Sequence, residues 1–109
     1  MNVVFMPEVE DYLFELTEIL FHKEYFGFKE TAIQYVSELI NDITVSLHHK
    51  QKKIAPDYFS KYGANMQYSV FKKNKNTQWY VFFNIYQKNE DPIYLVRFIS
   101  NNHVIAQYL

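Results

Sequence analysis

The spacing of apolar residues changes once along this chain, and that change most restricts the fold it can adopt. In residues 7–47 apolar side chains recur every three or four positions, which is the period of an amphipathic helix. In residues 68–100 the apolar residues form short runs rich in aromatic and β-branched side chains, which are typical of strands. A chain with a helical first half and an extended second half is expected to pack a helical layer on a sheet.

The helical half is expected to form a hairpin of two helices. Pro7 suits the first turn of the first helix, and the carboxylates of Glu8–Asp11 then lie at the positive end of its dipole. Gly27 is placed to end this helix by adopting a left-handed conformation. The second helix ends in the basic run His48–Lys53, again the favourable sign of charge. The apolar positions are Val9, Tyr12, Leu13, Leu16, Ile19 and Leu20 in the first helix, and Phe28, Ala32, Val36, Leu39, Ile40, Ile43 and Leu47 in the second.

The extended half predicts a meander of three antiparallel strands over Tyr68–Lys73, Gln78–Gln87 and Ile93–Ser100, because the segments between them have turn-forming residues. The short apolar run Asn2–Met6 predicts one more strand before the helices. Ile54–Gly63 is interpreted as a connecting loop whose aromatic side chains pack on the core.

The middle strand of this meander has two different faces. One alternating set is wholly apolar and is expected to face the helices, and it consists of Trp79, Val81, Phe83 and Ile85. The other set mixes aromatic and polar groups and predicts a partly solvated face, and it consists of Gln78, Tyr80, Phe82, Asn84 and Tyr86. The predicted fold is therefore α+β: an antiparallel β-sheet packed against an N-terminal helical hairpin, in the order β-α-α-β-β-β.

Length and composition narrow the class of protein. The 109 residues fit one domain spanning residues 1–109. The absence of cysteine excludes a disulfide framework and a thiolate zinc site. The first residues lack the pattern of a secretory signal, and no apolar run approaches the roughly 20 residues of a membrane span, so we expect a cytoplasmic protein.

Charge is distributed unevenly along the chain. Residues 1–45 contain nine acids and two bases, a balance of −7, whereas residues 46–109 contain nine bases and three acids, a balance of +6. Such asymmetry is a hint of a surface that faces a polyanion. Acids and bases that simply lie on different solvated elements give the same pattern, and charge alone favours this second interpretation.

Three segments resemble the RelE/ParE superfamily, the toxins of bacterial type II toxin–antitoxin modules. Val3–Glu10 looks like the family's opening, in which a strand runs into an acidic helix through a Pro-Glu step. Tyr68–Lys73 followed by Trp79–Phe83 resembles the central hairpin. Tyr94–His103 is similar to the last strand of the HigB branch, where an Arg-Phe-Ile step precedes a histidine.

The resemblance implies a toxin that inhibits translation by ribosome-dependent mRNA cleavage, that is, an mRNA interferase or endoribonuclease. Its implied partners are a cognate antitoxin protein, the ribosome and mRNA, with no membrane, metal or small-molecule cofactor. In this chemistry the ribose 2′-OH attacks the adjacent phosphate. The protein has to favour deprotonation of that hydroxyl, stabilise the phosphate with cations and protonate the leaving 5′-oxygen.

Five residues are candidates for the catalytic chemistry. Arg97 is the only arginine in the chain, and arginine is the natural bidentate phosphate binder, although a structural role for it is as plausible. Lys72 and Lys73 are further phosphate-binding candidates, although lysines beside a turn more often keep it soluble. His103 and Tyr108 are the acid–base candidates, and an ordinary surface or packing role is the alternative for each.

Three more residues are candidates for RNA binding. Lys75 would contact phosphate without sequence preference, and Tyr80 and Tyr86 would stack on bases, with packing as the alternative for both tyrosines. A metal site of His48, His49 and His103 is rejected, because adjacent histidines point in different directions.

The chain also departs from the family. Ser69 and Phe71 stand where the RelE branch has basic residues, Tyr80 stands where it has an arginine, and the sheet lacks the glutamate base of the YoeB branch. Two alternatives therefore accompany the nuclease: a non-nuclease toxin that acts on DNA gyrase like the ParE branch, and a catalytically silent interaction module of the same fold.

Overall fold

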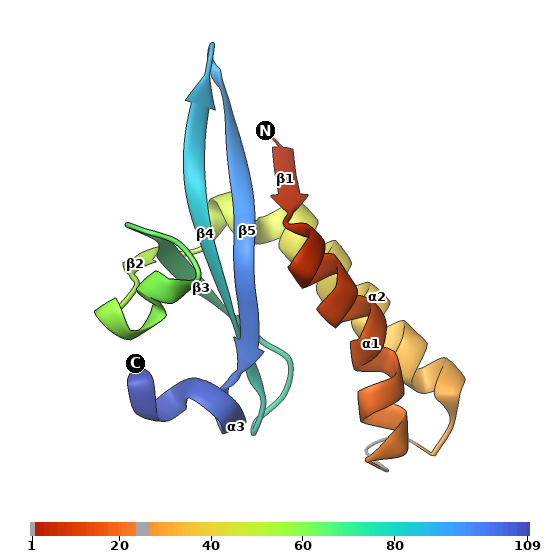
Figure 1. Ribbon diagram of the computed structural model, residues 1–109. Coiled ribbons are helices and arrows are strands. Elements are labelled where there is room, and N and C mark those ends of the chain that lie inside the picture. Colours follow the sequence, from red (N-terminus) through yellow and green to blue (C-terminus); the bar gives the residue numbers. More distant parts are fainter. Residues whose placement is uncertain (1, 24–26) are drawn as a thin grey trace.

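The computed structural model describes residues 2–23 and 27–109, and it has an α+β fold (Figure 1). Residues 24–26, which the sequence assigns to the end of the first helix, lie outside the described residues. The strands are β1 (Asn2–Phe5), β2 (Lys53–Ile54), β3 (Gln67–Lys72), β4 (Gln78–Lys88) and β5 (Asp91–Asn101). The α-helices are α1 (Pro7–His22), α2 (Lys29–Ser46) and α3 (Asn102–Ile105). Short 3-10 helices are η1 (Leu47–His49), η2 (Asp57–Lys61) and η3 (Ala106–Tyr108).

The five strands form one mixed sheet in the order β1-β5-β4-β3-β2. The meander β3-β4-β5 is antiparallel as predicted. The prediction of a wholly antiparallel sheet is wrong, because β1 pairs with β5 in parallel. A tight turn forces antiparallel pairing only on strands that follow each other in sequence, and β1 is followed by helices.

The order of elements is also longer than predicted. With β2 and α3 it is β-α-α-β-β-β-β-α. The two residues of β2 and the four of α3 are too short to produce a periodic pattern in the sequence.

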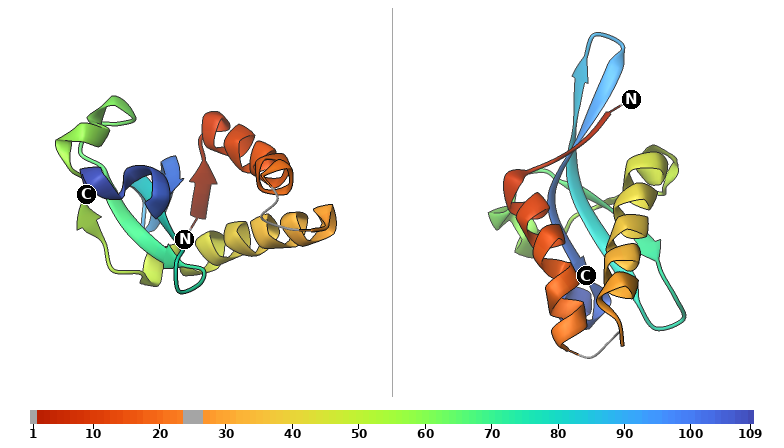
Figure 2. Two further views of the ribbon diagram at one scale, coloured as in Figure 1. Left: turned by 90° about the horizontal axis from the view of Figure 1, so that it is seen from below. Right: turned by 90° about the vertical axis from the view of Figure 1, so that its right-hand side faces the viewer.

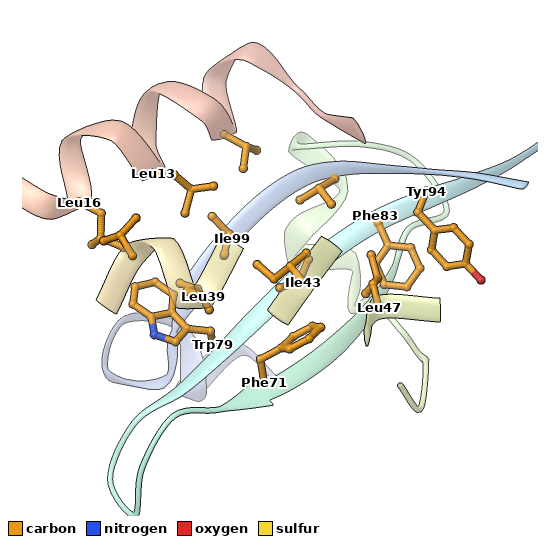
Figure 3. Packing of buried hydrophobic residues seen from close by; sticks show 14 residues of the cluster. Leu13, Leu16, Leu39, Ile43, Leu47, Phe71, Trp79, Phe83, Tyr94 and Ile99 are labelled. Atoms are coloured by element: carbon orange, nitrogen blue, oxygen red, sulfur yellow. The ribbon is translucent and has the colours of Figure 1, made fainter. Parts of the chain in front are cut away.

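Both long helices lie on the same face of the sheet (Figure 2). The main core between the two layers contains Leu13 and Leu16 of α1, Leu39 and Ile43 of α2, and Trp79 of β4, all buried (Figure 3). The other fully buried residues of this core include Val81 and Phe83, as the alternation in β4 predicts. Ile85, the last residue of that predicted face, is 39% exposed, and the β4-β5 hairpin extends past the helices at this end (Figure 1).

A second core lies on the opposite face of the sheet. Its buried members are Phe59, Met66, Tyr68, Phe82 and Ile105. Of the three aromatic side chains of the connecting loop that we expected on the core, Phe59 in η2 is buried there, whereas Tyr58 and Tyr62 are exposed. The prediction of a partly solvated face is wrong at Phe82, which is fully buried because residues from η2 and α3 cover it.

The end of the first helix differs from the prediction. Helix α1 ends at His22, and the N–H of Lys23 bonds the carbonyl oxygen of Ile19 at 3.0 Å. Gly27 does not adopt a left-handed conformation, and the positive φ angles in the described residues belong to Asn65 and Asn89. In the described residues no helix is long and apolar enough to cross a bilayer.

Candidate functional site

Arg97 is the extra residue of a β-bulge in β5. On β4, Phe82 pairs with Phe98 and the next residue, Phe83, pairs with Val96, so that Arg97 has no residue opposite it. Val96 belongs to the core under the helices and Phe98 packs in the second core, which places Arg97 and Phe98 together on the face away from the helices. Bulges re-aim side chains in this way and are frequent beside active sites.

Two neutral side chains hold the guanidinium of Arg97. Its Nε donates to Oδ1 of Asn84 at 2.5 Å, and its Nη2 donates to the hydroxyl of Tyr86 at 2.9 Å. Asn84 in turn donates from Nδ2 to the carbonyl oxygens of Ala64 and Asn65, at 3.0 and 3.4 Å. Because both partners of the guanidinium are uncharged, its positive charge is oriented without being neutralised by them.

Gly63 lets the loop after η2 lie directly on Arg97. A Cβ atom at this position would be 2.5 Å from Cδ of Arg97 and 3.2 Å from its Nε. The φ of Gly63 is not positive, so the residue is required by this close approach and not by a turn. The loop, Asn84 and Arg97 therefore form one interlocked unit.

Lys61 lies beside two stacked pairs of aromatic rings. Tyr62 stacks on Phe98 with 3.9 Å between ring centroids, and Tyr58 stacks on Tyr108 at 3.7 Å. The Nζ of Lys61 is 4.2 Å from the ring centroid of Tyr58 and 5.4 Å from that of Tyr62. We call Arg97, Asn84, Tyr86, Lys61 and Tyr62 the Arg97 cluster, and Tyr58 with Tyr108 the tyrosine pair.

The two phenols of the tyrosine pair differ in acidity. A hydrogen bond from Tyr108 lowers the pKa of Tyr58, and a hydrogen bond from Lys61 lowers it further. The bond to Tyr58 raises the pKa of Tyr108, and the same contact raises the pKa of Lys61. Tyr58 is therefore the more readily ionised phenol of the pair, and Lys61 is the cation that stabilises its phenolate.

A cleft of about 690 Å³ adjoins the Arg97 cluster. Arg97, Lys61 and Tyr62 line it on one side, and Glu8 and Tyr12 line it from α1. Arginine and lysine bind phosphate, and a tyrosine ring stacks on a base. The carboxylate and phenols are groups that transfer protons. The arrangement can thus hold a single-stranded nucleotide chain beside acid–base groups.

Four of the predicted site residues lie away from this cluster, at the other end of the sheet. Lys72 is exposed and pairs with Gln78, four residues or about 13 Å along β4 from Phe82. The Nζ of Lys73 is 3.7 Å from Oε2 of Glu38 and 4.9 Å from the ring centroid of Tyr35, so it ties the β3-β4 hairpin to α2.

Lys75 and His103 flank the same β3-β4 turn. Asn102 joins the two segments, because its Oδ1 accepts from the N–H of Gln78 at 2.9 Å and its Nδ2 donates to the carbonyl oxygen of Asn76 at 3.2 Å. His103 is exposed, and its backbone N–H donates to Oδ1 of Asn101, which caps α3. The structure therefore groups His103 with Lys75 and not with Arg97.

The three predicted tyrosines lie in three different settings. Tyr86 contacts Arg97 and is 47% exposed. Tyr108 belongs to the tyrosine pair. Tyr80 is half-buried against the second core and donates to Oε1 of Gln78 at 3.1 Å. Of the predicted residues, Arg97 and Tyr86 are thus in contact. Tyr108 contacts Tyr58, which lies beside Lys61, and Lys61 lines the same cleft as Arg97.

The sequence did not point to Lys61, Tyr62, Tyr58 or Asn84. The first three are in the segment interpreted as a connecting loop, and Asn84 was treated only as a polar residue of β4. A signal was nevertheless present, since Tyr58–Tyr62 interleaves a lysine with three aromatic residues, a composition that suits contact with nucleic acid.

Within residues 2–23 and 27–109, no group of three or more histidine, aspartate or glutamate side chains is placed to hold a metal ion. Comparisons with protein-family models, with curated proteins and with solved structures found no match for this chain. What supports a function is therefore the geometry of its own residues.

Proposed function

We propose that this protein is the toxin of a bacterial type II toxin–antitoxin pair and inhibits translation by ribosome-dependent mRNA cleavage. The observation that carries the proposal is the setting of Arg97. A bulge and two neutral hydrogen-bond partners orient its guanidinium on the cleft that Lys61 and the stacked ring of Tyr62 also line. The helical hairpin on one face of the β3-β4-β5 meander supports assignment to the RelE/ParE superfamily, with β2 and α3 as additions to the expected order.

The residues divide into three roles in this proposal. Arg97 and Lys61 stabilise the phosphate that the 2′-oxygen attacks, because both are cations on the same cleft. Tyr62 and Tyr86 stack on the neighbouring bases. Tyr58, whose pKa is lowered, acts as a phenolate that takes the proton of the 2′-OH. Tyr108, which is in contact with Tyr58, takes the place of His103 and gives its phenol proton to the leaving 5′-oxygen.

A gyrase-directed toxin without nuclease activity is the second candidate. Two observations favour it, because each removes a candidate from the catalytic site. His103 lies at the β3-β4 turn and not beside Arg97, and Lys73 pairs with Glu38. A catalytically silent interaction module is a third candidate on the same grounds. Action on the ribosome requires a cytoplasmic location, and so does action on gyrase.

Two purified assays separate these candidates. The protein is added to a reconstituted translation reaction and, separately, to a DNA gyrase supercoiling reaction. The nuclease proposal predicts that translation stops and supercoiling continues. Inhibition of supercoiling with normal translation would replace the first candidate by the second, and no effect of folded protein on either reaction would favour the silent module.

A further inference from the structure

The outer edge of β5 has no strand beside it beyond Val96 in the described part of the chain. β1 pairs with β5 only from Asn2 opposite Ile93 to Phe5 opposite Val96, and the N–H of Met6 closes this ladder by donating to the carbonyl oxygen of Val96 at 2.9 Å. Helix α1 then begins at Pro7. After the bulge at Arg97, residues 98–101 continue to pair with β4 on their other side, so the outward N–H and C=O groups of this segment face an unfilled edge.

The cleft of about 690 Å³ follows this edge. It is lined by four consecutive residues of β5, from Arg97 to Ser100. Arg97 and Phe98 share the face away from the helices because of the bulge, whereas Ile99 belongs to the core under the helices. The lining of the cleft therefore comes from both faces of the sheet, so we infer that the backbone edge between them forms its floor.

The walls of the cleft combine apolar and charged residues, which could accept the side chains of a bound strand. Val9 and Tyr12 contribute apolar surface from α1, and Val104 does so from α3. Two cations, Lys61 and Arg97, and one carboxylate, Glu8, line the same cleft, so positive charge is in excess there. An occupant that fits has an extended backbone, alternating apolar side chains and an acidic side chain near these two cations.

We propose that this cleft binds an extended segment of a partner protein, which joins the sheet as an added strand beside residues 97–101. The segment occupies the place that β1 would take if it continued past Met6. Main-chain hydrogen bonds to the β5 edge supply affinity, and apolar and acidic side chains supply specificity. Binding at this edge does not depend on the proposed function. Competition between the segment and RNA does rest on it, because Arg97 and Lys61 line the same cleft.

A synthetic peptide of alternating valine and threonine with one central glutamate is a suitable probe. It is titrated into the full chain labelled with ¹⁵N, and the backbone amides are followed by NMR. We expect shifts at Met6, Val9 and residues 97–101, and slower amide exchange in residues 97–101. A peptide with proline at two adjacent central positions lacks a ladder N–H whichever of its edges faces β5, and it is expected to bind at least about tenfold more weakly. Equal binding of the two peptides, or shifts elsewhere, would overturn the proposal.

A matched pair of variants tests the location. Val104 lines the cleft and Val45 lies on α2, and both are 58% exposed, so a glutamate is tolerated by the fold at either position. Val104→Glu is expected to weaken binding of the acidic peptide several-fold, and Val45→Glu to leave it unchanged. Equal effects of the two substitutions would contradict the assignment.

Two further outcomes are separated from these. If the protein sediments as a dimer without peptide, and if its amide signals at residues 97–101 change on dilution, a second copy of the chain occupies the edge. That result would overturn the peptide proposal. Peptide binding at the edge by a protein that neither binds nor cleaves RNA would uphold the added strand and remove the proposed function.

Discussion

The side chains of Arg97 and Asn84 are joined by a hydrogen bond of 2.5 Å from Nε to Oδ1, and Asn84 is also bonded to the loop that covers Arg97. One amide therefore orients the cation and anchors its cover. Because the bulge removes the residue opposite Arg97, the side chain depends on Asn84 and Tyr86 for its direction. The geometry of the site therefore depends on Asn84 as well as on Arg97.

Asn84→Ala removes this linkage and leaves Arg97 in place. A net contribution of about 1 kcal/mol per hydrogen bond predicts a loss of roughly 1–3 kcal/mol in the free energy of unfolding. We also expect weaker binding of single-stranded RNA, because the guanidinium loses its orientation. Urea unfolding and fluorescence anisotropy measure the two effects. Asn41→Ala, an exposed asparagine on α2, is the control and is expected to change neither quantity. RNA binding at the wild-type level in Asn84→Ala would contradict this role.

Gly63→Ala tests the close approach of the loop to Arg97. The new Cβ would meet Cδ of Arg97 at 2.5 Å, and this flexible side chain is expected to move and lose its bond to Asn84. The stability loss should stay near 1 kcal/mol, whereas RNA cleavage should fall strongly. Gly27→Ala is the matched control, since a Cβ there has nothing within 4 Å. If both variants cleave as the wild type does, the packing of Gly63 on Arg97 has no functional role.

Tyr35→Phe tests how the helical layer is attached to the sheet. The indole Nε1 of Trp79 donates to the hydroxyl of Tyr35 at 2.9 Å, and Trp79 is 1% exposed. Removal of the hydroxyl leaves this buried N–H without that acceptor, which costs about 1–3 kcal/mol. Tyr80→Phe removes a hydroxyl from a half-buried tyrosine and is expected to cost less. Chemical denaturation measures the free energy of unfolding of both variants. Equal losses would show that the hydrogen bond from Trp79 contributes no more than that of Tyr80.

The lowered pKa of the His48 imidazole predicts how the free energy of unfolding depends on pH. Its Nδ1 is out of contact with solvent and has no hydrogen-bond partner among the described residues. Burial lowers its pKa from 6.5, and His49 and Lys52 lower it further. The unfolded chain therefore binds a proton at this residue more readily, so the free energy of unfolding falls as the pH decreases from 6.5 toward the folded-state pKa.

Urea unfolding between pH 5 and pH 8 measures this dependence. His48→Leu is expected to reduce the acid-induced loss of stability, because the group that gains the proton is gone. His103→Gln removes an exposed imidazole of the same chain and serves as the control. An undiminished pH dependence in His48→Leu would show that the acid sensitivity arises elsewhere.

The sequence predicted the parts of the fold that depend on long periodic patterns. The stripe through Val9, Leu13 and Leu16 identified the buried face of α1, and the alternation through Trp79, Val81 and Phe83 identified the face of β4 that meets the helices. The parallel pairing of β1 left no local trace, because it is a contact between the two ends of the chain.

The candidate site was less predictable, for a physical reason. The bulge at Arg97 is not visible in the run Leu95–Ile99, yet it decides that Arg97 and Phe98 share one face. Strict alternation would have placed Phe98 with Val96 under the helices. Lys61 and Tyr62 reach the site only because η2 folds back over the sheet, and His103 leaves it because α3 is attached to the β3-β4 turn.

The most direct test of the central claim is primer extension on an mRNA in a reconstituted translation reaction, with the wild type, Arg97→Ala and the control Lys23→Ala, an exposed lysine at the end of α1. The account predicts new 3′ ends that require ribosomes, are absent with Arg97→Ala and persist with Lys23→Ala. Circular dichroism establishes that all three proteins are folded. Intact mRNA with folded wild-type protein, or unchanged cleavage by folded Arg97→Ala, would contradict it.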